Sequence, residues 1–148
     1  SNKNLDTILT FRNKEVSYGI NKVFFDVLNS SVEELPEVDY LINCVGIIKP
    51  YIDKDMKDSV YVNSLFPHKL ANFCESRNIK MLHITTDCVF TGKEGKYTED
   101  SLHDCTDIYG KSKSLGEPKN CMVIRTSIIG EEIHKNASLI EWVKSIEK

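Results

Sequence analysis

Residues 81–92 read MLHITTDCVFTG, an apolar run that ends in two threonines. The run does not alternate between polar and apolar residues, which is typical of a parallel strand covered on both faces. Further along, residues 108–117 read IYGKSKSLGE and predict a helix that is stopped by Pro118. A buried strand followed by a helix is the repeating unit of an α/β fold.

The remaining segments continue this alternation of strands and helices. Four further apolar runs predict strands at residues 7–11, 23–26, 40–45 and 121–125. Residues 60–76 have helical spacing of their apolar positions, and Pro67 predicts that this helix either starts there or kinks. Leu139, Ile140 and Val143 predict a last helix. We therefore expect an α/β fold with a doubly wound parallel sheet of at least five strands, in one domain over residues 1–148.

The composition argues against a protein that binds nucleic acid, spans a membrane or holds a metal ion. The chain has 148 residues, enough for one domain, and a formal net charge of −3. It has no basic stripe that would indicate nucleic acid and no apolar run long enough to span a bilayer. The five cysteines form no C-x-x-C pair and the four histidines lack metal-ligand spacing, so no metal is expected. Scattered cysteines are typical of reduced thiols, and we expect a cytoplasmic protein.

Tyr109 and Lys113 are four residues apart in the predicted helix, so both lie on one of its faces. A free tyrosine has a pKa of about 10, and a nearby ammonium group lowers it because it favours the phenolate. We therefore expect an acid–base pair, with the Thr86 hydroxyl at the strand end bonding the same substrate oxygen. The spacing alone is weak, because Tyr18 and Lys22 share it without such a context.

Taken together, these segments resemble the extended branch of the short-chain dehydrogenase/reductase superfamily. Within that branch they are most similar to the dTDP-4-dehydrorhamnose reductase group of sugar-nucleotide reductases and epimerases. The resemblance begins at about Thr7 and rests on four ordered words, TTDCVFTG at 85–92, YTED at 97–100, YGKSKSLGE at 109–117 and RTSIIG at 125–130. It implies a Rossmann-like fold.

The resemblance also implies a partial domain. The family's Gly-rich turn, which joins the first strand to a helix and holds the pyrophosphate, is not found in these residues. The first predicted strand resembles the family's second, and the family's smaller substrate domain does not follow the last helix. We expect a cofactor-binding domain that is incomplete at both ends, with a natural degenerate relative as the alternative. Weak or no nucleotide binding by these residues alone is a further expectation.

For the reaction, the resemblance implies that Tyr109 protonates a carbonyl oxygen. Lys113 would lower the pKa of Tyr109 and bond the nicotinamide ribose. Thr86 matches the Ser/Thr that orients the carbonyl, and Asp87 matches a position on the substrate side. The implied catalytic residues are therefore Thr86, Tyr109 and Lys113, with Thr86 and Asp87 at the substrate.

For the cofactor, Arg12 after the first strand predicts NADP, with NAD as the alternative. An arginine at this place accommodates a 2′-phosphate, whereas an acid bonds a 2′-hydroxyl. Asp26 and Val27 resemble the family's adenine contact.

The segment after the third predicted strand also resembles a cofactor contact, made by Cys44, Val45 and Gly46, where small residues let the backbone approach the cofactor. Tyr109 and Lys113 complete the implied cofactor set at the nicotinamide ribose. Asn63 resembles a helix asparagine that supports the active site, and capping of a helix start is an equal alternative.

The implied function is NADP-dependent reduction or epimerisation of a nucleotide-linked keto-sugar. The implied partner is a sugar nucleotide, with neither nucleic acid nor membrane, and a homodimer is one expected arrangement. Cys88 stands in place of the group's usual tyrosine and Ile128 in place of an aromatic residue, which puts dTDP-4-dehydrorhamnose itself in doubt as the substrate. A non-catalytic regulatory subunit like the methionine adenosyltransferase beta subunit is the alternative. A dehydratase fits less well, because the Thr-Asp word lacks the extra acid that usually follows it.

Overall fold

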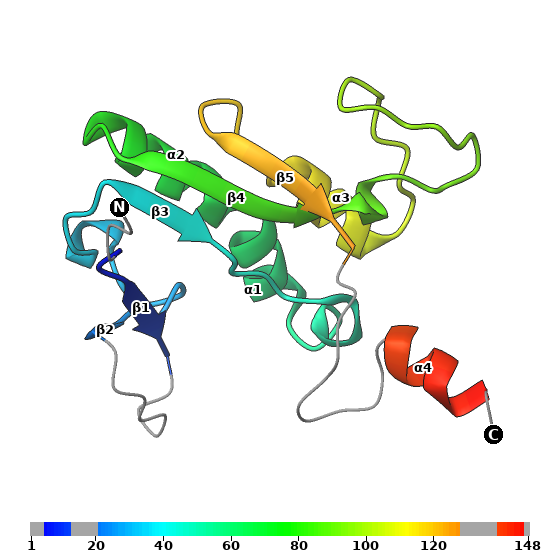
Figure 1. Cartoon of the computed structure of the whole chain (residues 1–148), viewed down its shortest axis with the longest axis horizontal. Coiled ribbons are helices and arrows are strands. Elements are labelled where there is room, and N and C mark those ends of the chain that lie inside the picture. The colour runs from blue at the N-terminus through cyan, green and yellow to red at the C-terminus, as the bar shows by residue number, and fades with distance from the viewer. Residues whose placement is uncertain (1–4, 13–20, 128–138, 147–148) are drawn as a thin grey trace.

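The computed structural model describes residues 5–12, 21–127 and 139–146, and the five strands in these ranges all pair in parallel (Figure 1). The strands are β1 (Ile8–Phe11), β2 (Asn21–Phe24), β3 (Tyr40–Asn43), β4 (Lys80–Thr86) and β5 (Met122–Thr126). Each strand overlaps one of the five segments that the apolar runs predict. The α/β class with parallel strands is therefore confirmed.

The strands form two sheets, whereas the sequence predicted one. β1 pairs with β2, and β3, β4 and β5 pair in that order, with Asn43 of β3 directly opposite His83 of β4. In the doubly wound order 3-2-1-4-5-6, another strand runs between the second and the fourth. Within the described residues, β1 and β3 are edges of their sheets, so no ladder of backbone hydrogen bonds joins the two halves.

A continuous helical stretch connects β3 to β4 and packs on one face of the three-stranded sheet (Figure 1). It runs as α1 (Met56–Val60), a π-helical turn at Tyr61–Leu65, and α2 (Phe66–Ser76). Pro67 lies in the first turn of α2, directly after the π turn. A proline has no N–H to donate, and an irregular turn accommodates that loss. Pro67 thus lies at the start of α2, as one of the two predictions had it, but the helical stretch as a whole begins earlier, at Met56.

α3 (Ile108–Leu115) lies on the same face of the sheet and matches the helix predicted before Pro118. The Asp107 carboxylate caps its start by accepting a hydrogen bond from the Gly110 amide at 3.1 Å. Two glycines allow α3 to pack closely on its neighbours. A Cβ on Gly116 would lie 1.8 Å from the Asn63 carbonyl oxygen, and a Cβ on Gly110 would lie 2.5 Å from the Cys88 carbonyl oxygen. α3 is thereby held against the π turn and the end of β4.

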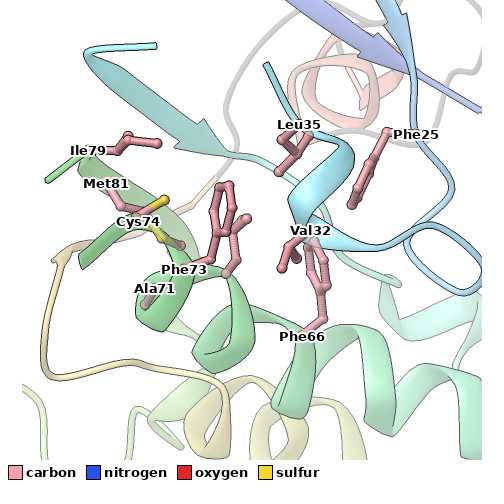
Figure 2. Close-up of a cluster of buried hydrophobic side chains, with 10 residues drawn as sticks. Phe25, Val32, Leu35, Phe66, Ala71, Phe73, Cys74, Ile79 and Met81 are labelled. Carbon is pink, nitrogen blue, oxygen red and sulfur yellow. The ribbon is translucent and has the colours of Figure 1, made fainter. Parts of the chain in front are cut away.

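The main hydrophobic core lies between α2 and the segment that follows β2. Figure 2 shows Phe66 and Phe73 of α2 directed toward Val32 and Leu35, in and after the short 3-10 helix η1 (Val32–Glu34). Phe25, directly after β2, belongs to the same cluster, and its ring centroid lies 6.1 Å from that of Phe66. Side-chain packing therefore connects the two sheets that backbone hydrogen bonds leave separate.

The predicted site residues follow the carboxyl ends of the strands. Arg12 follows β1, Asp26 follows β2, Cys44 follows β3 and Asp87 follows β4. Ligands of open parallel sheets bind at this edge. The last predicted helix is present as α4 (Leu139–Ile146), and no helix in the described part of the chain is long and apolar enough to cross a membrane.

Candidate active site

Thr86 and Tyr109 meet at the carboxyl end of β4. Thr86 is the last residue of that strand and is 8% exposed, and its hydroxyl accepts a hydrogen bond from the Cys88 amide at 3.1 Å. Tyr109 lies in the first turn of α3, where its phenol has the Thr86 hydroxyl as a hydrogen-bond partner. Lys113 lies one turn further along the same helix. The fold therefore brings Thr86 and Tyr109 together, and Lys113 follows one helical turn after Tyr109.

Burial sets the proton affinity of Tyr109. It raises the pKa of the phenol above its ordinary value, and the hydrogen bond with Thr86 offsets only part of this effect. The nearby Cys88 and Asp87 raise the pKa further, because negative charge disfavours a phenolate. The predicted lowering of this pKa by Lys113 is therefore wrong: Lys113 is not among the groups that shift it, and desolvation of the phenol is the largest effect. Tyr109 is therefore protonated at neutral pH, as a proton donor must be.

Lys113 is a buried cation beneath the loop that follows β3. Its side chain is only 5% exposed, and this burial lowers its pKa, while the Glu117 carboxylate raises it. The Lys113 Nζ lies 3.3 Å from the place that a Cβ on Gly46 would occupy. A larger residue at position 46 would thus crowd the ammonium group. Gly46 therefore brings bare backbone against this buried cation.

Asn63 connects the same loop to α3. It is fully buried, its Oδ1 accepts a hydrogen bond from the Ile47 amide at 2.8 Å, and its Nδ2 donates to the Ile47 carbonyl at 2.9 Å. Nδ2 also donates to the Ser112 hydroxyl at 3.1 Å, which in turn donates to the Tyr109 carbonyl at 2.8 Å. Asn63 lies in the π turn, in the middle of a helical stretch. The alternative that it caps a helix start is therefore wrong, and its contacts support the site.

Asn43 and His83 form a second buried link that sequence reasoning did not identify. They face each other across β3 and β4, and the Asn43 Nδ2 lies 3.1 Å from the His83 Nδ1. The Asn43 Oδ1 accepts a hydrogen bond from the Val45 amide at 3.0 Å, in the predicted cofactor loop. The partnership depends on the register of two strands, and a single sequence carries no direct signal of that register.

An open hollow of about 850 Å³ lies next to Asp87, on the predicted substrate side. Its walls come from the segment after β4 and from β5, and include Asp87, Cys88, Thr91, Tyr97, Glu99 and Arg125. The Asp87 carboxylate accepts hydrogen bonds from the Ser127 and Thr86 hydroxyls. Asp87 thus bonds Thr86 and also lines this hollow.

Arg125 holds the wall of the hollow in place. Its Nε and one terminal nitrogen bond the Glu117 carboxylate at 3.0 and 2.9 Å, and the other terminal nitrogen bonds the Glu99 carbonyl at 3.1 Å. Its guanidinium lies 5.4 Å from the centroid of the Phe90 ring. The two N–H groups in a bidentate contact with Glu117 form a strong charge-assisted pair. Arg125 therefore fastens the end of α3 and the loop around Glu99 to β5.

The segments that follow β1 and β2 are more exposed than the end of β4, and their hydrogen bonds join residues that are close in the sequence. Asp26 accepts hydrogen bonds from the Leu28 amide at 3.1 Å and the Asn29 Nδ2 at 2.9 Å, and these bonds, with smaller help from Arg12, lower its pKa. Val27 packs against the core. The structure thus places Arg12 near Asp26, as expected for two residues at one end of a cofactor, while their roles stay predictions.

The cofactor-binding roles of these residues stay predictions. No group of three or more His, Cys, Asp or Glu side chains gathers as metal ligands in the described part of the chain. The Lys113 ammonium beneath the bare backbone at Gly46 instead offers a donor to a ligand hydroxyl. Cys44 and Val45 are exposed on the same loop.

Two residues named in the sequence analysis, Tyr18 and Ile128, lie outside the described residues.

Residues 36–142 match the family model described as the RmlD substrate binding domain. This match covers well over half of the chain and includes β3, β4 and β5 with the helices between them. The chain therefore belongs to this family. The resemblance found in the sequence words is confirmed.

Individual relatives agree with this assignment. The chain is similar to the probable low-salt glycan biosynthesis reductase Agl14 of Haloferax volcanii, with 31% identity over 124 residues. That alignment covers 74% of this chain and 40% of the relative, so the chain spans less than half of that protein's length.

Solved structures share the fold. A dTDP-4-dehydrorhamnose reductase of Clostridium acetobutylicum superposes with a TM-score of 0.64 at 20% identity, covering 93% of this chain and 59% of the other. A dTDP-4-dehydrorhamnose reductase of Bacillus anthracis, solved in complex with NADP, superposes with a TM-score of 0.56 at 22% identity, covering 74% and 46%. These likenesses confirm the Rossmann-like fold of the chain.

Proposed function

We propose that the protein carrying these residues reduces or epimerises a nucleotide-linked keto-sugar with NADP(H). The observation that supports this proposal is the meeting of the Thr86 hydroxyl and the Tyr109 phenol at the carboxyl end of β4, next to the buried Lys113. Two O–H groups that lie this close together can both form hydrogen bonds with one carbonyl oxygen of a substrate. The names of the relatives, which are reductases of the same class, add support.

Tyr109 donates the proton in this proposal. Its raised pKa keeps the phenol protonated at neutral pH, so that an O–H is available to the carbonyl oxygen of the sugar. The Thr86 hydroxyl bonds the same oxygen and orients it. As negative charge develops on that oxygen, the Lys113 ammonium stabilises both the oxygen and the phenolate that Tyr109 leaves behind.

The cofactor would bind along the carboxyl ends of the strands. A bound nicotinamide supplies hydride to the carbonyl carbon. In the proposed arrangement Lys113 donates to a ribose hydroxyl through the space above Gly46, and Cys44 and Val45 line the approach. Arg12 would select NADP over NAD by pairing with a 2′-phosphate, and Asp26 and Val27 would contact the adenine.

The sugar nucleotide would enter from the hollow beside Asp87. Asp87 already accepts hydrogen bonds from hydroxyl groups of Thr86 and Ser127, which is the chemistry that a sugar hydroxyl offers. Cys88 lines the same hollow where the reductase group usually has a tyrosine. The proposed substrate is therefore a nucleotide-linked keto-sugar whose identity the substrate panel below decides. A homodimer stays a prediction.

The decisive experiment incubates the full-length protein with a panel of nucleotide-linked keto-sugars and follows NADPH absorbance. Loss of absorbance with at least one sugar, together with a single new hydroxyl in the product, supports the reductase. Exchange of a sugar stereocentre without net loss of NADPH supports the epimerase. Tight NADPH binding without turnover of any sugar would instead favour the non-catalytic regulatory subunit.

A further inference from the structure

His83 is a fully buried histidine that the proposed chemistry does not use. It lies in the middle of β4, and its Nδ1 is 3.1 Å from the Asn43 Nδ2. The Asn43 amide oxygen is already the acceptor for the Val45 amide, so the group that faces His83 is the N–H donor. The His83 Nδ1 must then be the unprotonated acceptor. The imidazole proton is therefore on Nε2, which has no hydrogen-bond partner within the described residues.

The surroundings of His83 keep the ring neutral. Burial, followed by the positive charge of Lys113 from α3, lowers its pKa to about 4, and His68 from α2 adds a smaller effect in the same direction. A backbone hydrogen bond at Asn43 acts in the opposite direction, whereas the Nδ2 bond to the bare Nδ1 favours the neutral ring. A proton on Nδ1 would place two N–H donors against each other. If Nε2 were protonated as well, the ring would also carry a second positive charge beside Lys113. The neutral ring with its proton on Nε2 avoids both.

The Asn43 side chain transmits this state to the loop after β3. Residues 44–47 are held at two points, by the Val45 amide on Asn43 and by the Ile47 amide and carbonyl on Asn63. Gly46 lies between the two points and faces the Lys113 Nζ. The orientation of the Asn43 side-chain amide determines whether the Val45 N–H faces its oxygen, which accepts a hydrogen bond, or its NH2 group, which cannot. That rotation is fixed in turn by the His83 Nδ1.

We propose that His83 is a positioning residue: by accepting a hydrogen bond from Asn43, it fixes the loop 44–47 over Lys113. The cofactor role of that loop rests on the proposed function, but the positioning itself does not. His83 touches neither substrate nor cofactor in this account and acts only through Asn43. Its effect should therefore fall on the loop, and on cofactor affinity more than on the chemical step.

The first test reads the tautomer directly. Nitrogen-15 NMR of the imidazole at neutral pH should give an unprotonated Nδ1 and a protonated Nε2 for His83, with no titration down to at least pH 5. His103, which is only partly buried, provides a comparison within the same chain. A proton on Nδ1, or titration of His83 at the ordinary pKa of a free histidine, would overturn the proposal. This measurement needs no cofactor and no substrate.

The second test compares His83→Asn with His83→Leu. The two side chains have the same number and branching of heavy atoms, but only asparagine keeps an acceptor near the Nδ1 position. We expect hydrogen exchange of the Val45 amide to be about five- to tenfold faster in His83→Leu than in His83→Asn, the effect of one lost hydrogen bond. The Ile47 amide, held by Asn63, should differ little between them. Equal exchange of Val45 in the two variants would contradict the role of His83.

The third test measures NADPH affinity and turnover of the full-length protein. His83→Leu should weaken NADPH binding by about tenfold relative to His83→Asn, with a smaller change in kcat at saturating NADPH. Equal affinities of the two variants, in a protein whose wild type binds NADPH, would remove the link to the cofactor loop. If the wild type does not bind NADPH at all, the proposed function fails, while the tautomer and the Val45 exchange still decide the positioning role of His83.

Discussion

The end of β4 and the end of β2 both carry residues with predicted roles, but the two regions are built differently. Around Lys113 and His83, polar side chains are buried and bond partners that are 40 to 49 positions away in the sequence. The Asp26 carboxylate bonds groups only two and three positions away, within its own turn. One region is fixed by the tertiary structure and the other by a local turn.

This difference indicates which half of the site is ready for its chemistry. Buried contacts between distant segments leave little freedom, so the residues for which we propose proton transfer would be oriented in advance, which would favour catalysis. Local contacts fix the turn at Asp26, but they do not fix its distance from Lys113. Substitutions near β4 should therefore have large effects, and substitutions near β1 and β2 should have small effects that are confined to cofactor choice.

Tyr109→Phe in the full-length protein should have the largest effect. It removes the proton donor but keeps the ring, so kcat should fall by roughly 10²–10⁴-fold, whereas KM should change little. Steady-state kinetics with the reactive keto-sugar measures this loss. Tyr18→Phe is the matched control, because Tyr18 has the same spacing to a lysine outside the motif. Wild-type turnover in both variants would refute the catalytic role of Tyr109.

Lower pH should destabilise the β4 region through His83. Its pKa in the folded protein is about 4, below the ordinary value of 6.5, so the unfolded state takes up a proton first as the pH falls. The free energy of unfolding should therefore decrease from pH 6.5 to pH 4 by up to about 3 kcal/mol.

Denaturant unfolding at several pH values measures this slope, and His83→Asn should flatten it. Asp26 and Asp104 have pKa values lowered from 3.8, so their own losses begin at lower pH. A slope that is the same in His83→Asn and in the wild type would assign the pH dependence to other groups.

Gly116→Ala should destabilise the contact between α3 and the π turn. The new Cβ would lie 1.8 Å from the Asn63 carbonyl oxygen, and both sides of this contact are backbone. We expect a loss of about 1–3 kcal/mol in the free energy of unfolding, as for other overpacked sites. Lys111→Ala, on the exposed face of the same helix, is the control and should stay within about 0.5 kcal/mol. A neutral Gly116→Ala would show that α3 can shift without cost.

Arg12→Ser should have the smallest effect on the fold, because Arg12 is exposed at the end of β1. In the full-length protein it should reduce the preference for NADPH over NADH by about tenfold, as expected for one lost charge-assisted contact with a 2′-phosphate. The ratio of the two kcat/KM values measures this change. An unchanged ratio would remove Arg12 from the cofactor assignment.

Local sequence signals predicted most of the elements and the candidate residues. The five strands were recognised from apolar runs, although only β4 is largely buried within the described residues. The end of α3 was predicted from Pro118, and the structure adds the caps at Asp107 and Gly116. Thr86, Tyr109 and Lys113 were recognised from ordered words, and the helix rise alone puts the last two on one face.

The tertiary structure decided what depends on contacts between distant segments. The register of β3 and β4 sets His83 opposite Asn43, and the depth of burial sets the direction of the Tyr109 pKa against the prediction from spacing. The separation of β1 and β2 from the other strands is likewise a matter of which edges pair. A sequence pattern indicates which segments form strands and helices. The contacts of a side chain and its protonation state depend on how those strands and helices pack together.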